Sequence, residues 1–241
     1  MLRTILFYPF FIPFSLIISI CTTIAGMLDK SGKMIRYWSC LWGRGGLWAA
    51  RVQLELDLSA LDTSKNYIFM FNHQSQVDIL TAFGVLGDFT AGFVSKQSLF
   101  KIPFFGRAMY ASGSIPVDRS NRRRAMKSID AAVVRLQEGT RSLIIFPEGT
   151  RSNDLTKLQE FHTGGLIMAL RSGLPVAPIV IVGSGEILPK GAWFFHPTLR
   201  RLRVKALPPI DPAKYTIKQR EQFKQDLYDM MNSTYLEMRR Q

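Results

Sequence analysis

A histidine and an aspartate lie five positions apart in the stretch FNHQSQVDIL, residues 71–80. An imidazole that donates one N–H to a carboxylate keeps its other nitrogen free to take a proton, so His73 and Asp78 are a candidate general base. On one ideal helix the two side chains would point about 140° apart around the axis. They can meet if His73 ends a loop and Asp78 reaches back from the first turn of a helix that begins near Ser75.

The same residues also fit a purely structural interpretation. SQVD has the pattern of a capping box, with Ser75 as the N-cap and Asp78 at the third helical position. This interpretation accounts for Ser75 and Asp78 but leaves His73 unexplained, whereas the catalytic interpretation accounts for all three. The spacing alone leaves both open.

A base needs a nucleophile, and the sequence contains no G-x-S-x-G elbow of the serine hydrolases. Neither Cys21 nor Cys40 has a candidate base nearby in the sequence, so we expect the nucleophile to be a hydroxyl group of the substrate. These two cysteines provide no metal-ligand cluster and no disulfide framework, which favours a reducing compartment. We therefore expect neither a metal nor a cofactor.

Polar residues follow four apolar runs that have the pattern of strands. His73 follows YIFMFN, Lys96 ends GFVSK, Asp118 and Arg119 follow SIPV, and the EGTR of residues 148–151 follows LIIFP. In open α/β sheets, ligands bind at the carboxyl ends of the parallel strands. The cationic bias of these clusters predicts a single crevice that binds an anion.

Short apolar runs alternate with helical stretches from residue 51 onwards. We expect helices over residues 75–87, 121–139, 162–173 and 216–239. We expect strands in RVQLELDL, YIFMFNH, FTAGFVSK, GSIPVDR, SLIIFPEG, VAPIVIVGS and RLRVKAL. This alternation predicts one α/β domain over residues 51–241, with a mostly parallel sheet and helices on both faces.

Residues 1–50 are expected to bind a membrane as a helical hairpin. The stretch between Arg3 and Asp29 has no charge and is long enough to cross a bilayer, for which about 20 apolar residues suffice. Pro9 and Pro13 are expected to kink or break its helix. The tryptophans and basic residues of segment 33–48 suit the headgroup layer. A cleaved signal peptide, a spanning anchor and a hairpin within one leaflet all stay open.

The chain of 241 residues is strongly basic, with a formal net charge of +13. Such a charge predicts anionic partners, and the absence of zinc-finger spacing and of aromatic RNA-binding motifs argues against nucleic acid. Membrane lipids are the favoured partner, and the positive-inside rule places the α/β domain on the cytoplasmic side of the cytoplasmic membrane. The basic run of residues 119–124 is either a solvated face or a contact for an anionic surface.

Four motifs resemble those of the glycerolipid acyltransferases, in the same order along the chain. NHQSQVD is similar to the N-H-x4-D signature of that family, GSIPVDRSNR to its second block, FPEGTRS to its third and LPVAPIVI to its fourth. The N-terminal membrane segment also fits. Within the family, the sequence is most similar to the bacterial 1-acyl-sn-glycerol-3-phosphate acyltransferases, which convert lysophosphatidate to phosphatidate.

The resemblance implies a role for each matching residue. His73 would be the general base on the 2-hydroxyl of a lysophospholipid acceptor, with Asp78 orienting it, and that oxygen would attack the thioester of acyl-CoA or acyl-carrier protein. Six further residues would bind the acceptor: Lys96, Arg119, Glu148, Gly149, Thr150 and Arg151. Because phosphate repels a carboxylate, Glu148 is expected to hold an arginine or a glycerol hydroxyl.

Several alternatives stay open. Where the family usually has a lysine after the third block, this chain has His162, either a surface histidine at a helix start or a pH-dependent cation near the site. The acceptor could equally be a lyso-ornithine lipid, another lysophospholipid or glycerol 3-phosphate. A more distant alternative is a non-enzymatic membrane protein that binds anionic lipid through its basic surface.

Overall fold

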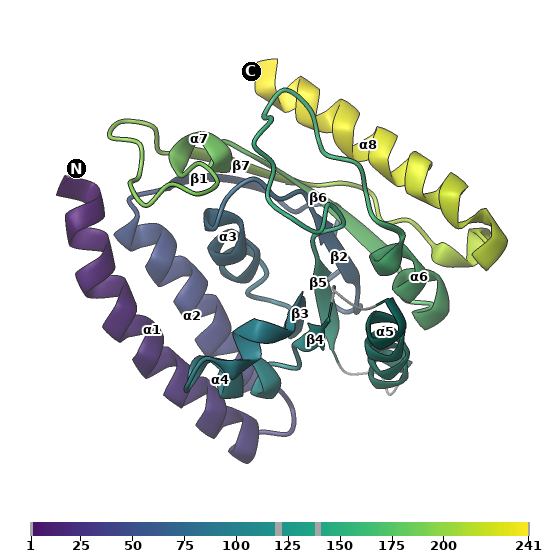
Figure 1. Ribbon diagram of the computed structural model, residues 1–241, viewed down its shortest axis with the longest axis horizontal. Coiled ribbons are helices and arrows are strands. Elements are labelled where there is room, and N and C mark those ends of the chain that lie inside the picture. The colour runs from purple at the N-terminus through teal and green to yellow at the C-terminus, as the bar shows by residue number, and fades with distance from the viewer. Residues whose placement is uncertain (1, 119–121, 138–140, 241) are drawn as a thin grey trace.

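The computed structural model describes residues 2–118, 122–137 and 141–240, and the side chains of residues 122–125, 135 and 137 lie outside that description. A seven-stranded sheet with the order β1-β7-β6-β2-β5-β3-β4 forms the centre (Figure 1). Its strands are β1 (Gln53–Asp57), β2 (Ile68–Phe71), β3 (Ala91–Lys96), β4 (Ile115–Val117), β5 (Ser142–Ile145), β6 (Val176–Val182) and β7 (Arg201–Ala206). Only β6 and β7 pair antiparallel, which confirms the predicted mostly parallel α/β fold.

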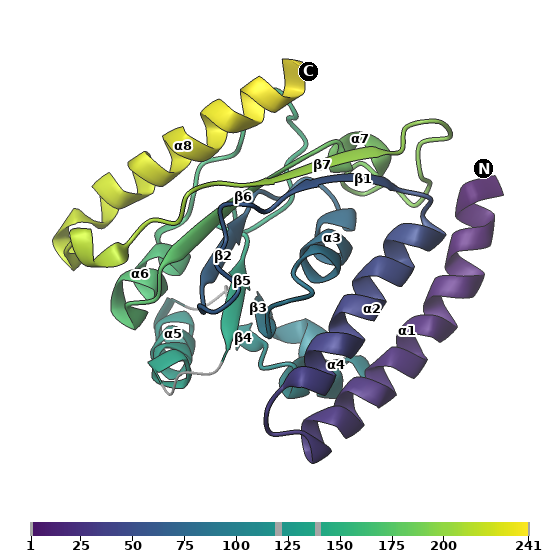
Figure 2. The ribbon, with the colours of Figure 1, turned by 180° about the vertical axis from the view of Figure 1, so that it is seen from behind.

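Helices cover both faces of the sheet (Figures 1 and 2). One face carries α1 (Leu2–Leu28), α2 (Lys33–Ala49), α3 (Val77–Val85) and α4 (Phe105–Ala111). The other carries α5 (Arg122–Gln137), α6 (Thr163–Ser172) and α8 (Arg220–Arg240), while the short α7 (Ser184–Ile187) follows β6. Three short 3-10 turns lie at Gln97–Lys101, Pro212–Lys214 and Ile217–Gln219. The sequence did not predict α4, because seven residues that follow Pro103 are too few to display a helical period.

The core has two halves, one on each side of the sheet. Along β2, Phe69 and Phe71 face α2 and α3, whereas Ile68 and Met70 face α5, α6 and α8. All four side chains are completely buried. Burial on both faces explains why the central strands are continuous apolar runs, and the four polar clusters therefore stand where these runs end.

The first two helices form a hairpin that packs on the α/β domain (Figure 1). At the crossing of α2 and α3, a Cβ on Gly43 would lie 2.4 Å from the backbone nitrogen of Gly84, so only glycine permits this close approach. The predicted break at Pro9 and Pro13 does not occur, because α1 is one continuous helix through both prolines. Each proline lacks the backbone N–H that would bond to the preceding turn. The packing of α1 against α2 and α4 compensates for these missing hydrogen bonds.

Helix α1 buries both polar and apolar side chains against the protein and is apolar towards the outside. Arg3, Thr4, Ser19 and Thr22 are buried against the domain. The outward face is aliphatic, with Leu2, Ile5, Ile12, Ile17, Met27 and Leu28 all more than half exposed. Among the described residues, α1 is the one helix whose length and hydropathy would allow it to cross a membrane. An outward apolar face of this length calls for apolar surroundings, which supports a membrane anchor.

Candidate active site

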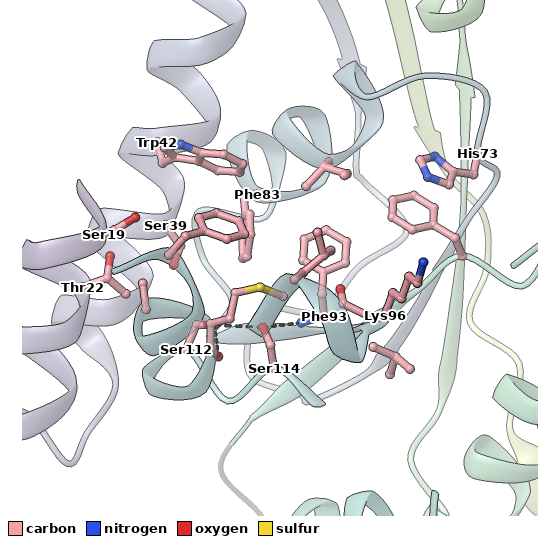
Figure 3. Close-up of a pocket in the computed structure, with 18 of the residues that line it drawn as sticks. Ser19, Thr22, Ser39, Trp42, His73, Phe83, Phe93, Lys96, Ser112 and Ser114 are labelled. Atoms are coloured by element: carbon pink, nitrogen blue, oxygen red, sulfur yellow. Dashed lines mark hydrogen bonds between the residues drawn. The ribbon is translucent and has the colours of Figure 1, made fainter. Parts of the chain in front are cut away.

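The loop between β2 and α3 holds the candidate base. His73 Nδ1 lies 2.8 Å from Asp78 Oδ2, so the two side chains meet as the spacing allows. The side chain of Asp78, in the first turn of α3, is completely buried, whereas that of His73 is 13% exposed. The His73 ring stacks on Phe146 with the two centroids 4.0 Å apart. The imidazole is thus fixed by Phe146 on one ring face and by Asp78 at Nδ1, and it lines a pocket (Figure 3).

The hydrogen bonds of Asp78 set the state of the imidazole. Asp78 Oδ2 also accepts from the backbone N–H groups of Gln74, at 2.6 Å, and of Ser75, at 2.8 Å. Because these backbone groups can only donate, Oδ2 is an acceptor for all three partners, and Nδ1 of neutral His73 carries the hydrogen. The lone pair of His73 is then on Nε2, as a general base requires.

The predicted capping box is present only in half. Ser75 N–H donates to Asp78 as expected, but Ser75 Oγ accepts from Val77 N–H at 3.1 Å and donates to the carbonyl of Leu188 at 2.7 Å. Helix α3 therefore begins at Val77, two residues later than predicted. The carboxylate of Asp78 serves the helix start and His73 together, so the two interpretations of the sequence are compatible.

The backbone around His73 is fixed to both neighbouring strands of β2. The buried side chain of Asn72 accepts from Ile181 N–H at 2.7 Å and donates to Ile181 O at 2.9 Å on β6. On the β5 side, His73 N–H donates to Glu148 Oε1 at 2.7 Å, and His73 C=O accepts from Ser152 N–H at 2.8 Å. No role was predicted for Asn72 or Ser152, because both contacts depend on which strands are neighbours in the sheet.

Glu148 supports this loop through hydrogen bonds to amide groups, and no arginine of the described residues contacts its carboxylate. Its side chain is almost completely buried, and its second oxygen, Oε2, accepts from the side-chain amide of Gln159 at 2.9 Å and from Gln159 N–H at 3.3 Å. Both oxygens thus bind amide groups of the protein. Among the described residues no arginine takes the expected place, and the contact of Glu148 with a glycerol hydroxyl stays a prediction. Burial raises the pKa of Glu148 to about 7, against the opposing effect of these hydrogen bonds.

The raised pKa of Glu148 predicts a pH-dependent stability. The folded protein keeps this proton up to a pKa of about 7, while the unfolded chain loses it near 4.5, so this contribution to stability falls as pH rises between these values. We expect Glu148→Gln to remove this part of the pH dependence of the free energy of unfolding. It should also leave an N–H group without an acceptor, which costs about 1–3 kcal/mol.

Urea unfolding of both proteins at about pH 5 and about pH 8 measures the difference. Glu160→Gln is the matched control, because the side chain of Glu160 is 87% exposed on the same segment. An unchanged slope in Glu148→Gln, with the control also unchanged, would show that Glu148 is not the titrating group.

Four of the predicted acceptor-binding residues line the same pocket as His73: Lys96, Gly149, Thr150 and Arg151. Figure 3 shows the ammonium end of Lys96 directed towards the end of the pocket where His73 lies. Within the described part of the chain, neither Lys96 nor Arg151 has an ion-pair partner. Two uncompensated cations beside a base form a place for an anionic substrate. Arg119 and the side chains of the run 119–124 lie outside the described residues.

Gly149 and His162 are in close contact. Gly149 has a φ of +67°, a backbone conformation that favours glycine. A Cβ there would also lie 2.7 Å from Cδ2 of His162, so both the backbone and the space around it disfavour a side chain. His162 is exposed, directly precedes α6 and lies beside Gly149 of the pocket, so it fits both interpretations that the sequence leaves open.

The whole pocket, with His73 at one end, has a volume of about 360 Å³, and its larger part is an apolar cavity. Phe146, Phe93, Phe83 and Trp42 line it on the way to α1, α2 and α4 (Figure 3). Hydroxyl groups lie around its far part, from Ser19, Thr22, Ser39, Ser112 and Ser114. None of the residues of β6 lines it, and all of them are buried, so the fourth motif, LPVAPIVI, forms part of the core. The cavity can hold a hydrocarbon chain whose polar end lies at His73. In the described part of the chain, no three His, Cys, Asp or Glu side chains could together hold a metal ion.

Helix α8 contacts the loop between β2 and α3 through Tyr235. Gln74 Nε2 donates to Tyr235 Oη at 2.6 Å, and Tyr235 Oη donates to Leu155 O at 2.7 Å. Tyr235 is completely buried and also accepts from Arg239 at 3.1 Å. Since the backbone of Gln74 binds Asp78, α8 helps to fix the carboxylate.

We expect Tyr235→Phe to lower turnover several-fold and to cost about 1–2 kcal/mol of stability, because the Gln74 amide loses its acceptor. Tyr228→Phe is the matched control on the same helix, since Tyr228 Oη donates only to Leu158 O, at 3.1 Å. The control should lose stability without losing turnover. An equal fall of kcat in both variants, measured beside their unfolding curves, would contradict a positioning role for Tyr235.

Comparison with known proteins places the chain in a family. Residues 54–182, more than half of the chain, match the family model described as Acyltransferase. The 1-acyl-sn-glycerol-3-phosphate acyltransferase of Limnanthes alba is 32% identical over 188 residues, which cover 77% of this chain and 65% of the relative. The protein of that name from Escherichia coli strain K12 is 29% identical over 219 residues, which cover 86% of this chain and 84% of the relative.

A solved structure shares the fold. The crystal structure of the 1-acyl-sn-glycerophosphate (LPA) acyltransferase PlsC from Thermotoga maritima superposes with a TM-score of 0.84 at 24% identity, over 100% of this chain and 96% of that one. The matched segment spans less than two thirds of the length of the Limnanthes alba relative.

Proposed function

The chain belongs to the acyltransferase family, and on that premise we propose that it moves a fatty acyl group to the 2-hydroxyl of 1-acyl-sn-glycerol 3-phosphate, giving phosphatidic acid. One observation carries the proposal: the His73–Asp78 pair stands between an apolar cavity and two uncompensated cations. An acceptor that combines an acyl chain, a hydroxyl and a phosphate matches these three features in chemistry. Two relatives that bear the name of this activity add support.

The proposed reaction is a single displacement. Nε2 of His73 takes the proton of the acceptor hydroxyl while that oxygen forms a bond to the thioester carbonyl carbon of acyl-CoA or acyl-carrier protein. The carbon–sulfur bond then breaks, and the imidazolium returns its proton to the leaving thiolate. Asp78 stabilises the imidazolium in between, through its bond to Nδ1. Holding both substrates in line supplies much of the rate.

The acceptor phosphate is proposed to bind between Lys96 and Arg151, beside the backbone of Gly149 and Thr150. A guanidinium fork can bind two phosphate oxygens, and Gly149 allows the backbone to come close. Arg119 stays in the proposal as a third cation on the strength of its motif alone. The apolar cavity would receive an acyl chain.

Arg151→Ala should raise the KM for the acceptor about 10- to 100-fold with little change in kcat, because a charged hydrogen bond to phosphate is made in both the bound and the reacting state. Steady-state kinetics with varied acceptor and saturating donor measure this. Arg220→Ala removes the same charge at the exposed start of α8 and should leave KM unchanged. A fall in kcat at unchanged KM would show that Arg151 acts in the chemical step instead.

We propose that α1 lies along one leaflet and does not thread through the bilayer. Both ends of α1 touch the α/β domain: Thr4 accepts from Phe195 N–H at 3.0 Å, and a Cβ on Gly26 would meet Ala111 of α4 at 2.7 Å. A spanning helix would have to leave one of these contacts. The net charge of +13 favours the anionic cytoplasmic leaflet, with the catalytic domain on that side.

Complementation tests the proposed function in a cell. In a strain that cannot acylate lysophosphatidate, the chain should restore growth and phosphatidic acid synthesis, and His73→Ala should not. A wild-type chain that accumulates in the membrane without restoring growth would contradict the proposed acceptor. Use of acyl-CoA and of acyl-carrier protein is then compared with the purified protein.

A further inference from the structure

The loop that joins α7 to β7, residues 188–200, exposes two neighbouring aromatic side chains. Trp193 is 73% exposed and Phe194 is 57% exposed, whereas the next residue, Phe195, is 4% exposed. Single exposed apolar residues are common on soluble proteins, but adjacent large aromatics that extend a larger apolar face mark an interaction surface.

That larger face belongs to α1, and the loop is fastened to its first turns. Tyr8 Oη donates to Trp193 O at 2.9 Å, and the rings of Phe7 and Phe195 pack at 4.8 Å between centroids. Figures 1 and 2 both show this loop beside the N-terminus. Close by, Leu2, Ile5 and Leu6 of α1 are 66%, 60% and 51% exposed, so the two apolar surfaces lie at the same end of the molecule.

Arg3 makes the loop and the hairpin one rigid unit. Its buried guanidinium donates to Ala50 O at 2.6 Å, to His196 O at 2.9 Å and to Leu199 O at 2.7 Å. These bonds join the start of α1, the end of α2 and the second half of the loop. Any surface that receives the outward face of α1 therefore meets the loop in a fixed position.

The charges around the loop suit an anionic lipid surface. No Asp or Glu occurs between Glu186 and Asp211, while Lys190 and Arg200 lie in or beside the loop. Arg200 and Arg51 are close enough to Arg3 to repel its charge. Basic residues in the same loop as exposed aromatics match the headgroup layer, where indole rings and basic side chains are both favoured. An acidic protein surface would explain the cations but not the aliphatic face of α1 that continues the patch.

We propose that Trp193 and Phe194 insert into the same leaflet as the outward face of α1, so that the loop is a second membrane contact of this protein. The inference rests on the proposed membrane attachment of α1. Its consequence is geometric: a single helix in the interface can roll about its axis, whereas a helix and a rigid loop together fix the orientation. The mouth of the active-site pocket is then held at one angle to the lipid surface from which the acceptor comes.

Site-specific fluorescence tests the proposal. Cys21 and Cys40 are replaced by alanine, and an environment-sensitive fluorophore is attached at Trp193→Cys, at Ile12→Cys on the outward face of α1, or at Ile217→Cys, which is exposed at the far side near α8. Each labelled protein is mixed with vesicles of phosphatidylcholine and phosphatidylglycerol that carry a nitroxide-labelled lipid. We expect a blue shift and quenching at positions 193 and 12, and neither at 217.

The outcomes separate this proposal from the one on which it rests. Quenching at position 12 without quenching at 193 would overturn the loop contact and leave the attachment of α1 in place. Quenching at neither position would overturn the attachment itself, and equal quenching at all three would show that the label inserts by itself and overturn the loop assignment.

A second measurement uses unlabelled protein. The double variant Trp193→Ser, Phe194→Ser should lower vesicle partitioning by about 10-fold or more, while Ile217→Ser should not. Turnover in detergent solution should be unchanged in both variants, because neither site touches the pocket. Unchanged partitioning of the double variant would overturn the proposal.

Discussion

His73→Ala should reduce kcat by a factor of about 100 to 10,000, because general-base catalysis typically contributes this much. Acceptor binding should be largely kept, since Lys96 and Arg151 reach the pocket from other segments of the chain. Steady-state kinetics with the purified variant give kcat, and equilibrium binding of the acceptor without donor gives its affinity.

The control for this variant is His196→Ala. The imidazole of His196 accepts from Leu199 N–H at 3.1 Å within its own loop and lies outside the pocket, so turnover should be unchanged. If His73→Ala kept more than about a tenth of the wild-type kcat, another group or water would be taking the proton.

Asp78→Asn should lower kcat by a comparable factor, up to about 10,000-fold, with little change in the KM for the acceptor. The asparagine keeps the size of the side chain but brings no negative charge to the imidazolium that forms in the reaction. Its amide must also satisfy three N–H donors that now bind one carboxylate oxygen. The kinetics are measured beside the unfolding curve, so that lost activity is separated from lost fold.

Asp88→Asn is the matched control. It makes the same substitution of a carboxylate by an amide, at an exposed position just after α3. Near-normal turnover of a stably folded Asp78→Asn would mean that His73 needs no carboxylate. The pair would then be only the start of a helix.

The strand pattern predicted that the candidate residues would gather at one edge of the sheet. Because β2, β3, β4 and β5 are parallel, the residues that follow them along the chain gather at one end, and His73, Lys96 and the EGTR segment do so. The contact of His73 with Asp78 could be predicted from the sequence, because the two residues lie in one loop and the helical turn that follows it. The distance between them is decided locally.

The hydrogen bonds that hold the site in place could not be predicted from the sequence, because they join residues far apart along the chain. Asn72 binds a residue 109 positions away, Glu148 binds the backbone of one 75 positions away, and Gln74 binds Tyr235 across 161 positions. These contacts follow from β2 lying between β6 and β5 and from α8 returning behind the sheet. For the same reason the contacts of Glu148 with the amide groups of His73 and Gln159 could not be predicted from its motif. The prolines of α1 show the converse, since the packing of the helix outweighs a local preference to break.

The most direct test is a transfer assay with the purified wild-type protein, a labelled acyl donor and a panel of acceptors. The panel contains 1-acyl-sn-glycerol 3-phosphate, glycerol 3-phosphate, a lyso-ornithine lipid and a lysophospholipid without a free phosphate. A base beside a phosphate pocket and an apolar cavity predicts that the label appears in phosphatidic acid and far less in any other product. Label in another product alone, or in none with either donor, would contradict the account.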